Sequence, residues 1–267
     1  MTMRGTLLFL LACLALPTAQ AGECPRIVSQ APYISESLEW LGLGGCIAGA
    51  SRYDQRDVPA TGGVLDPDPA AIAALQPELV FVADWTDAKT WRDAIPQGAR
   101  GFRLHGFRSM AEVEENLRVI ANAAGLPDAD SRAEHFAEQW RDKADAVDGD
   151  GTRVLLLSAC SGAPYAYGGE TWLHDLFTEA GFRVVAPGPR VQRVEGDDPA
   201  TAVATLVRET GAEAIIAFRE HGPEQCPLLA LKTDARVVGM DGQHFLHPAP
   251  VVLEGLDALA RAWEAAR

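Results

Sequence analysis

The chain has 267 residues, of which 48% are hydrophobic and 22% are charged, a composition typical of a globular protein. Its formal net charge of −14 argues against nucleic-acid binding, because phosphate groups are bound by basic surfaces. We interpret the acidity as a well-solvated surface and expect a monomer that buries its own core.

The first expected element is an export signal over residues 1–21. Arg4 precedes an apolar run, which is followed by Pro17 and the small-residue triplet Ala19-Gln20-Ala21. This order is typical of a secretory signal peptide, cleaved here before Gly22. The run is about half of the ~20 residues that a membrane-spanning helix needs. Cleavage at Cys13, giving a lipid-anchored protein, is the alternative, but it leaves a short apolar segment. We therefore expect a soluble periplasmic protein.

Short β-rich runs alternate with helical patterns along the rest of the chain, which is typical of parallel sheets covered by helices. Strands are expected at 26–30, 46–50, 79–83 and 100–104 in the first half, and at 153–158, 182–186, 214–218 and 235–239 in the second. The sequence therefore predicts an α/β fold with two parallel-sheet lobes.

Two helices are expected between the halves, at 109–125 and 131–147, each beginning with a capping box. The boxes pair Ser109 with Glu112 and Ser131 with Glu134. The second helix carries an apolar stripe of Phe136, Trp140, Ala144 and Val147 and is predicted to bridge the lobes. We expect a first lobe over 22–127, a bridging helix over 128–149 and a second lobe over 150–267.

Four cysteines follow the predicted cleavage site. An even number in an exported chain indicates two disulfides, for which three pairings exist. We favour Cys24 with Cys46 and Cys160 with Cys226, because each pair then falls within one lobe. A thiolate metal site is the alternative, but the chain has no C-x-x-C motif.

Aspartates precede proline at two expected helix starts, one in each half. These are Asp66-Pro67-Asp68-Pro69 and Asp197-Asp198-Pro199, and a strand follows each helix. Aspartate before proline is a common helix N-cap. The repeated order of helix and strand suggests two similar lobes.

The stretch from RIVSQAPYISESLEWLGLGG through SRYDQRDVPATGG to LQPELVFVADW resembles the first lobe of a known family. This is the family of helical-backbone, metal-chelate-binding periplasmic proteins, which includes receptors for cobalamin, haem and ferric siderophores. The resemblance implies two lobes bridged by one long helix, little hinge motion, and delivery of the chelate to an inner-membrane ABC permease with its ATPase. It implies no catalytic cofactor.

Ligands of open α/β sheets bind beyond the carboxyl ends of the strands. The residues that follow the expected strands include several aromatic and Arg side chains, which suit a flat chelate and its carboxylates. In the first lobe they are Tyr33, Arg52, Tyr53, Trp85 and His105. In the second they are Tyr165, Tyr167, Arg219, His221, His244, Phe245 and His247.

Tyr53, Trp85 and either Tyr165 or Tyr167 match positions that line the corrinoid cleft in the cobalamin-binding type of the family. The turn at Gly62-Gly63 lacks a Trp of that type, and Gln192 stands near another expected aromatic. Two alternatives stay open. A Tyr, His244 or His247 suits the iron of haem, and Arg52 with Arg219 suits an anionic siderophore.

The family docks to its permease through one carboxylate on each lobe. The matching helix starts here offer a candidate set of Asp66, Asp68, Glu195, Asp197 and Asp198.

An enzyme that uses the same cleft is the competing class, and its usual motifs are missing from the sequence. Ser161 lies in Ala-Cys-Ser-Gly rather than in G-x-S-x-G, and Glu220-His221 is not part of H-E-x-x-H. The glycines at 42–45 precede a strand instead of following one, which is wrong for a dinucleotide turn. A periplasmic metal-binding protein outside transport is a third possibility.

Overall fold

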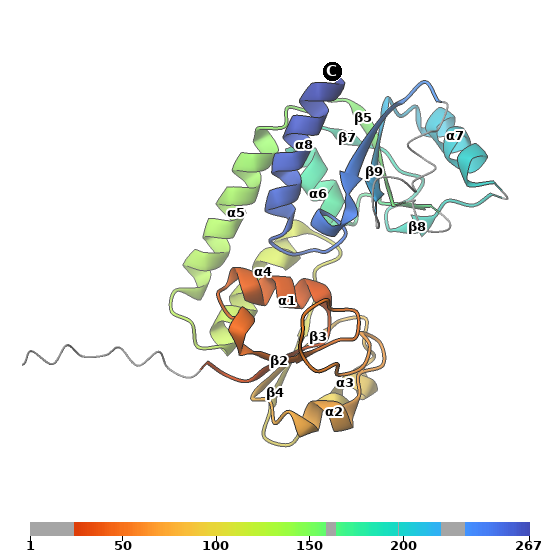
Figure 1. The fold of residues 1–267 in the computed structure, drawn as a ribbon. Helices are drawn as coiled ribbons and strands as arrows, with labels where there is room; N and C mark the ends of the chain where they lie inside the picture. The colour runs from red at the N-terminus through yellow and green to blue at the C-terminus, as the bar shows by residue number, and fades with distance from the viewer. Residues whose placement is uncertain (1–23, 159–163, 197, 220–232) are drawn as a thin grey trace, which may run out of the picture.

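The computed structural model describes residues 24–158, 164–196, 198–219 and 233–267. They form two α/β lobes, one above the other in Figure 1, with helix α5 running along one side from the first lobe to the second. The first lobe contains β1 (Ile27–Ser29), α1 (Pro32–Trp40), η1 (Gly44–Cys46), β2 (Ile47–Ala50), α2 (Pro69–Ala74), β3 (Leu79–Ala83), α3 (Ala88–Ala94) and β4 (Arg100–Leu104). Then come α4 (Met110–Ala123) and α5 (Ala129–Asp145).

The second lobe contains β5 (Arg153–Ser158), β6 (Tyr165–Ala166), α6 (Trp172–Glu179), β7 (Arg183–Val184), β8 (Gln192–Arg193), α7 (Pro199–Thr210), β9 (Ala214–Arg219), β10 (Arg236–Asp241), η3 (Gly242–His244) and α8 (Val252–Ala266). No helix in the described ranges combines the length and the hydropathy that a bilayer span requires.

The first sheet is four-stranded and wholly parallel, in the order β2-β1-β3-β4. Its central strand, β3, is buried along its whole length because helices cover both faces. Phe81 faces the core that includes α1 and α4, while Val80 and Val82 pack with Ile72 of α2 on the other face. The four strands predicted in this half are confirmed.

The second sheet is mixed rather than parallel. Strands β10, β9, β5 and β7 are parallel, but β6 pairs antiparallel with β5 and β8 antiparallel with β6. The sequence predicted the four parallel strands and missed β6 and β8, each of which is two residues long. The strand expected at 182–186 is shortened to β7 because only its first half pairs with β5.

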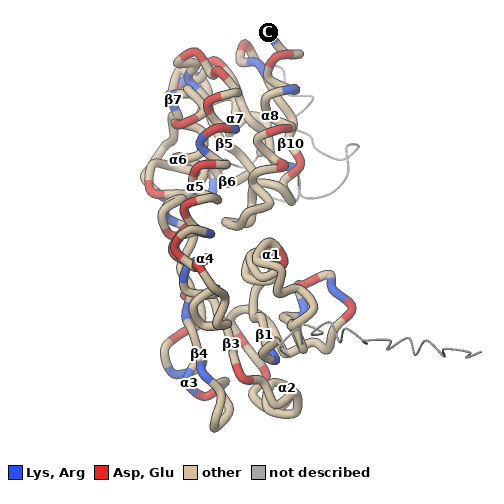
Figure 2. The backbone as a smooth tube through the Cα atoms, turned by 90° about the vertical axis from the view of Figure 1, so that its left-hand side faces the viewer, with Lys and Arg blue, Asp and Glu red and all other residues tan. Residues whose placement is uncertain are grey.

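Helix α5 is the predicted bridge, and its apolar stripe is buried as expected: Phe136, Trp140, Ala144 and Val147 are all at most 5% exposed. The predicted capping box of Ser131 with Glu134 is wrong. The helix begins two residues earlier, after Asp128, whose left-handed backbone makes no side-chain cap. Residues of both charges alternate along α4 and α5 in Figure 2. The lobe limits at 22–127, 128–149 and 150–267 stay a prediction.

Three of the other predicted caps are present. Ser109 accepts a hydrogen bond from Glu112 N, although the Glu112 carboxylate accepts from Gly106 N and Arg108 N instead of returning to Ser109. Asp68 caps α2 and Asp198 caps α7.

The predicted disulfide between Cys24 and Cys46 is confirmed, with 5.7 Å between the Cα atoms. It ties the segment that leads into β1 to the residue directly before β2. Cys160 and Cys226, like the export signal and His221, lie outside the described residues.

Candidate ligand-binding cleft

The carboxyl ends of the parallel strands of both sheets face the space between the lobes. In the first lobe, Tyr33 follows β1, Tyr53 follows β2, Trp85 follows β3 and Phe107 follows β4. In the second, the segment after β10 runs from Gly242 to His247. This arrangement is the usual site for ligands in open α/β sheets.

These segments enclose a cavity of about 440 Å³ between the lobes. That volume lies within the usual range for small-molecule sites, roughly 300–1,000 Å³. Most of the lining is apolar or aromatic. The lining residues are Ala31, Pro32, Tyr33, Tyr53, Gln55, Val64, Trp85, Phe107, Gly242, Gln243, Leu246 and His247. We call this cavity the cleft.

The first-lobe wall of the cleft is built from stacked rings. Trp85 is 55% exposed and lies over Phe107 at 4.1 Å between ring centroids. Phe107 in turn packs edge-on against Tyr33 and against Trp172 of α6, at 5.3 and 5.2 Å. Tyr53, 60% exposed, has the Arg52 guanidinium 5.2 Å from its ring. The rings of Tyr53 and Trp85 are therefore open to solvent, and Trp85 rests on the packed ring of Phe107.

Tyr33 forms part of the floor and is only 2% exposed. Its hydroxyl donates a hydrogen bond to the Leu104 carbonyl at 3.1 Å. Burial raises the pKa of Tyr33 far above its usual value, and the negative charges of Asp84 and Glu112 act in the same direction. The Tyr33 hydroxyl is therefore a neutral hydrogen-bond donor that is already engaged by a backbone carbonyl.

The predicted second-lobe aromatics are not brought into the cavity. Tyr167 and Phe245 are buried in the core, where both pack against Phe218, and Tyr167 donates a hydrogen bond to Ser158 Oγ. Tyr165 is 44% exposed and pairs with Ser158 at the carboxyl end of β5, beside Arg193 of β8 rather than in the cavity lining.

The predicted polar residues have separate environments. Arg52 forms an ion pair with Asp66 at 2.8 Å, and Arg219 is partly buried at the end of β9, in register with Asp241. His244 lies 3.6 Å from Glu254 of α8, outside the cavity lining. His247 does line the cavity and contacts Glu36 of α1 at 2.6 Å, which joins the two lobes.

His105, expected near the ligand, is paired with Asp84 at 2.8 Å at the ends of β4 and β3, outside the cavity lining. In the described part of the chain, no group of three or more His, Cys, Asp and Glu side chains is arranged to hold a metal ion.

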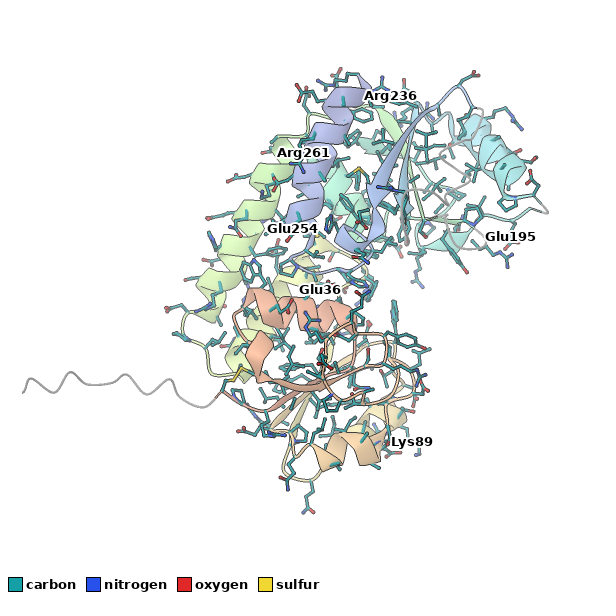
Figure 3. The ribbon with its side chains drawn as sticks, viewed as in Figure 1. Glu36, Lys89, Glu195, Arg236, Glu254 and Arg261 are labelled. Atoms are coloured by element: carbon teal, nitrogen blue, oxygen red, sulfur yellow. A yellow bond between two sulfur atoms is a disulfide. The ribbon has the colours of Figure 1, made fainter. Side chains whose placement is uncertain are left out.

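The candidate docking carboxylates lie on both lobes. Asp66 is paired with Arg52, and Asp68 and Asp198 are occupied as helix caps. Hydrogen bonds from Thr201 lower the pKa of Asp198, so this carboxylate stays ionised. Glu195 stands at the far edge of the second lobe in Figure 3, and Asp197 lies outside the described residues.

Eight lining residues were not predicted from the sequence: Ala31, Pro32, Gln55, Val64, Phe107, Gly242, Gln243 and Leu246. Phe107 carries a usable signal, because it comes three residues after β4, much as Trp85 comes two residues after β3. The others have no pattern that marks them as cavity residues, and their positions depend on how the lobes meet.

This two-lobed fold is that of the periplasmic binding proteins for metal chelates. No protein-family model and no curated protein matches the chain. Solved structures do match it. The periplasmic haem-binding protein BhuT, in complex with two haems, is 18% identical, with a TM-score of 0.72 over 91% of this chain and 98% of that one.

Two further structures have comparable likeness. A periplasmic haem-binding protein from Pseudomonas aeruginosa is 20% identical, with a TM-score of 0.70 over 91% of this chain and 94% of its own. The periplasmic vitamin B12-binding protein BtuF of Vibrio cholerae is 14% identical, with a TM-score of 0.69 over 91% and 98% of the two chains. The fold that the sequence resemblance implied is therefore confirmed.

Proposed function

We propose that this protein is the periplasmic substrate-binding protein of an ABC importer, that it binds a planar metal chelate in the cleft, and that it delivers the chelate to an inner-membrane permease. A corrinoid such as cobalamin is the favoured ligand. The observation that supports this most directly is the pair of exposed rings, Tyr53 and Trp85, on an apolar cavity shared by both lobes.

Stacking on a macrocycle is the chemistry that this wall offers. A flat chelate covers both rings at once and removes their apolar faces from water. Gln55, Gln243 and His247 supply a few polar contacts that fix orientation. A corrinoid needs no protein ligand to its metal for this mode of binding, whereas haem would use Tyr53 or His247 of the lining as its iron ligand.

The transport role is supported by the fold, by the N-terminal sequence and by acidic side chains on both lobes. The solved structures that match this fold include periplasmic binding proteins for haem and vitamin B12. The N-terminal segment reads as a signal peptide. Acidic side chains on both lobes, among Asp66, Asp68, Glu195 and Asp198, are the candidates for docking to Arg-containing pockets on a permease.

Tryptophan fluorescence titrations with cobalamin, cobinamide, hemin and ferric siderophores test this function. We expect corrinoid binding at micromolar concentration or below, and about thirtyfold weaker binding by Trp85→Ala, since losing an aromatic anchor costs about 2 kcal/mol. Trp91→Ala is the matched control, because Trp91 lies on α3 outside the cavity lining.

Absorbance separates the ligand classes. A stacked corrinoid changes little in its spectrum, whereas haem bound through His247 shifts its Soret band and identifies the protein as a haem carrier. If no chelate binds and free metal ions do, the proposed function is wrong. If Trp85→Ala and Tyr53→Ala both bind the ligand as tightly as wild type, the cleft is not the site.

A further inference from the structure

A second, smaller cavity of about 230 Å³ opens beside the cleft, and we call it the acidic annex. The two cavities are neighbours, because five residues line both of them: Pro32, Tyr53, Gln55, Gln243 and His247. Apart from Pro32, the annex is lined by residues with polar side chains: Glu36, Glu39, Tyr53, Asp54, Gln55, Arg56, Gln243 and His247. Glu36 is on α1, on the side of the first lobe that faces the second (Figure 3).

The guanidinium of Arg56 in the annex pairs with two carboxylates through its terminal nitrogens, while its Nε is buried without a hydrogen-bond partner among the residues that the structure describes. Arg56 donates to Asp54 Oδ1 at 2.9 Å and lies 2.6 Å from Glu39 Oε2. His247 is paired with Glu36 Oε1 across the lobes. Three carboxylates outnumber the one guanidinium and the one imidazole in the annex, so its net charge is negative.

Two carboxylate oxygens in the annex are buried and make no hydrogen bond within the described part of the chain: Asp54 Oδ2 and Glu36 Oε2. The Asp54 side chain is only 2% exposed. A buried ionised oxygen without a donor is costly, and the cost is recovered when a bound group supplies one. The free positions of the annex are therefore these two acceptor oxygens and one donor, Arg56 Nε, which a carboxamide matches with its N–H and C=O groups.

We propose that the acidic annex is a subsite for N–H-bearing groups, carboxamide or ammonium, on the rim of the chelate. The protein then selects chelates with an amide-bearing rim over those whose rim carries carboxylates. Carboxamide N–H groups donate to Asp54 and Glu36, whereas a rim carboxylate meets like charge and offers no donor. This inference rests on the proposed function and specifies its ligand class.

Two matched pairs of probes separate the contribution of the rim to affinity from that of the macrocycle. The first compares dicyanocobinamide with dicyanocobyrinic acid, in which the side-chain amides are carboxylates. The second compares the bis-amide of hemin with hemin itself. We expect the amide member of each pair to bind at least tenfold more tightly, as a hydrogen bond to a charged group is worth about a factor of ten or more.

The variants Glu36→Gln and Asp54→Asn remove one negative charge each and keep the shape of the side chain. Each is expected to reduce the amide-to-carboxylate affinity ratio about tenfold. Glu254→Gln, which removes an exposed carboxylate of α8 outside the annex, is the matched control and keeps the wild-type ratio. Thermal unfolding checks that each variant is folded. If Asp54→Asn does not fold, Glu36→Gln still tests the proposal, because the ion pairs of Arg56 are with Asp54 and Glu39 and not with Glu36.

The outcomes separate a failure of the annex proposal from a failure of the proposed function. If the macrocycles bind but carboxylate rims bind as well as amide rims, the annex proposal is wrong and the proposed function stands. The same holds if the selectivity is unchanged in both variants. If no member of either pair binds, the proposed function and the annex proposal fail together.

Discussion

The buried phenol of Tyr33 links the cleft floor to stability at high pH. Its pKa is raised in the folded protein above the value near 10 of an unfolded chain. Neutral Tyr33 therefore gives its full contribution to stability below about pH 10, and this contribution is lost as the pH rises further. The unfolded state releases the proton and the folded state retains it.

We expect wild type to lose up to about 1.4 kcal/mol of unfolding free energy per pH unit above pH 10 through this one group, and Tyr33→Phe to lose less. Urea denaturation at pH 8 and pH 11 measures the difference. Tyr53→Phe is the control, since Tyr53 is exposed. An identical pH dependence in wild type and Tyr33→Phe contradicts the assignment.

The location of a single residue in the cavity was predictable where it depends only on the position of a strand end. Tyr53 and Trp85 follow strands directly and line the cavity. Tyr167 and Phe245 also come soon after strands, but their side chains turn into an aromatic core that is visible only once α6 and β9 are packed. The contact of His247 with Glu36 joins positions 211 residues apart, and no local pattern predicts it.

The disulfide is the element-scale feature with a direct test. It closes a loop with a sequence separation of 22, around α1 and η1. In the chain-entropy picture such a loop contributes about 3 kcal/mol by restricting the unfolded chain. We expect the double variant Cys24→Ala with Cys46→Ala to lose about this much unfolding free energy in urea denaturation.

Peptide mapping without reduction provides the chemical check. A peptide that links Cys24 to Cys46 is expected, and one that links Cys24 to Cys160 contradicts the structure.

The periodic elements were predictable because each carries its own hydrophobic pattern. The buried strand LVFVA and the stripe on α5 needed no tertiary information. Strands β6 and β8 had no hydrophobic pattern to detect, because two residues do not establish an alternation of apolar and polar side chains. The start of α5 was misplaced because Ser131 and Glu134 fit a capping box in sequence, while Asp128 begins the helix in space.

At the scale of the whole molecule, the lobes already touch on both sides of the cleft. Met110 N donates to Asp175 of α6 at 3.0 Å, Phe107 packs on Trp172, and His247 meets Glu36. With α5 packed against both α4 and α8, a large hinge motion would break all these contacts.

Small-angle scattering with and without a saturating corrinoid is therefore expected to give radii of gyration that agree within about 1 Å, since helix-bridged lobes move by small shear rather than hinge closure. A contraction of several ångströms on binding would show that α5 is not a rigid bridge. Glu36→Gln with the same ligand tests whether the lobe contact at His247 contributes to this rigidity.

The attachment of Cys24 to Cys46 also fixes how the molecule is oriented on anything joined to its amino end. Both cysteines precede parallel strands, so they lie at the edge of the first sheet opposite the cleft. A carrier protein, a bead or a sensor surface coupled there is at the end of the first sheet opposite the strand ends that line the cleft. Tension applied at that end is divided between β1 and β2 through the disulfide, so neither strand is pulled from the sheet alone.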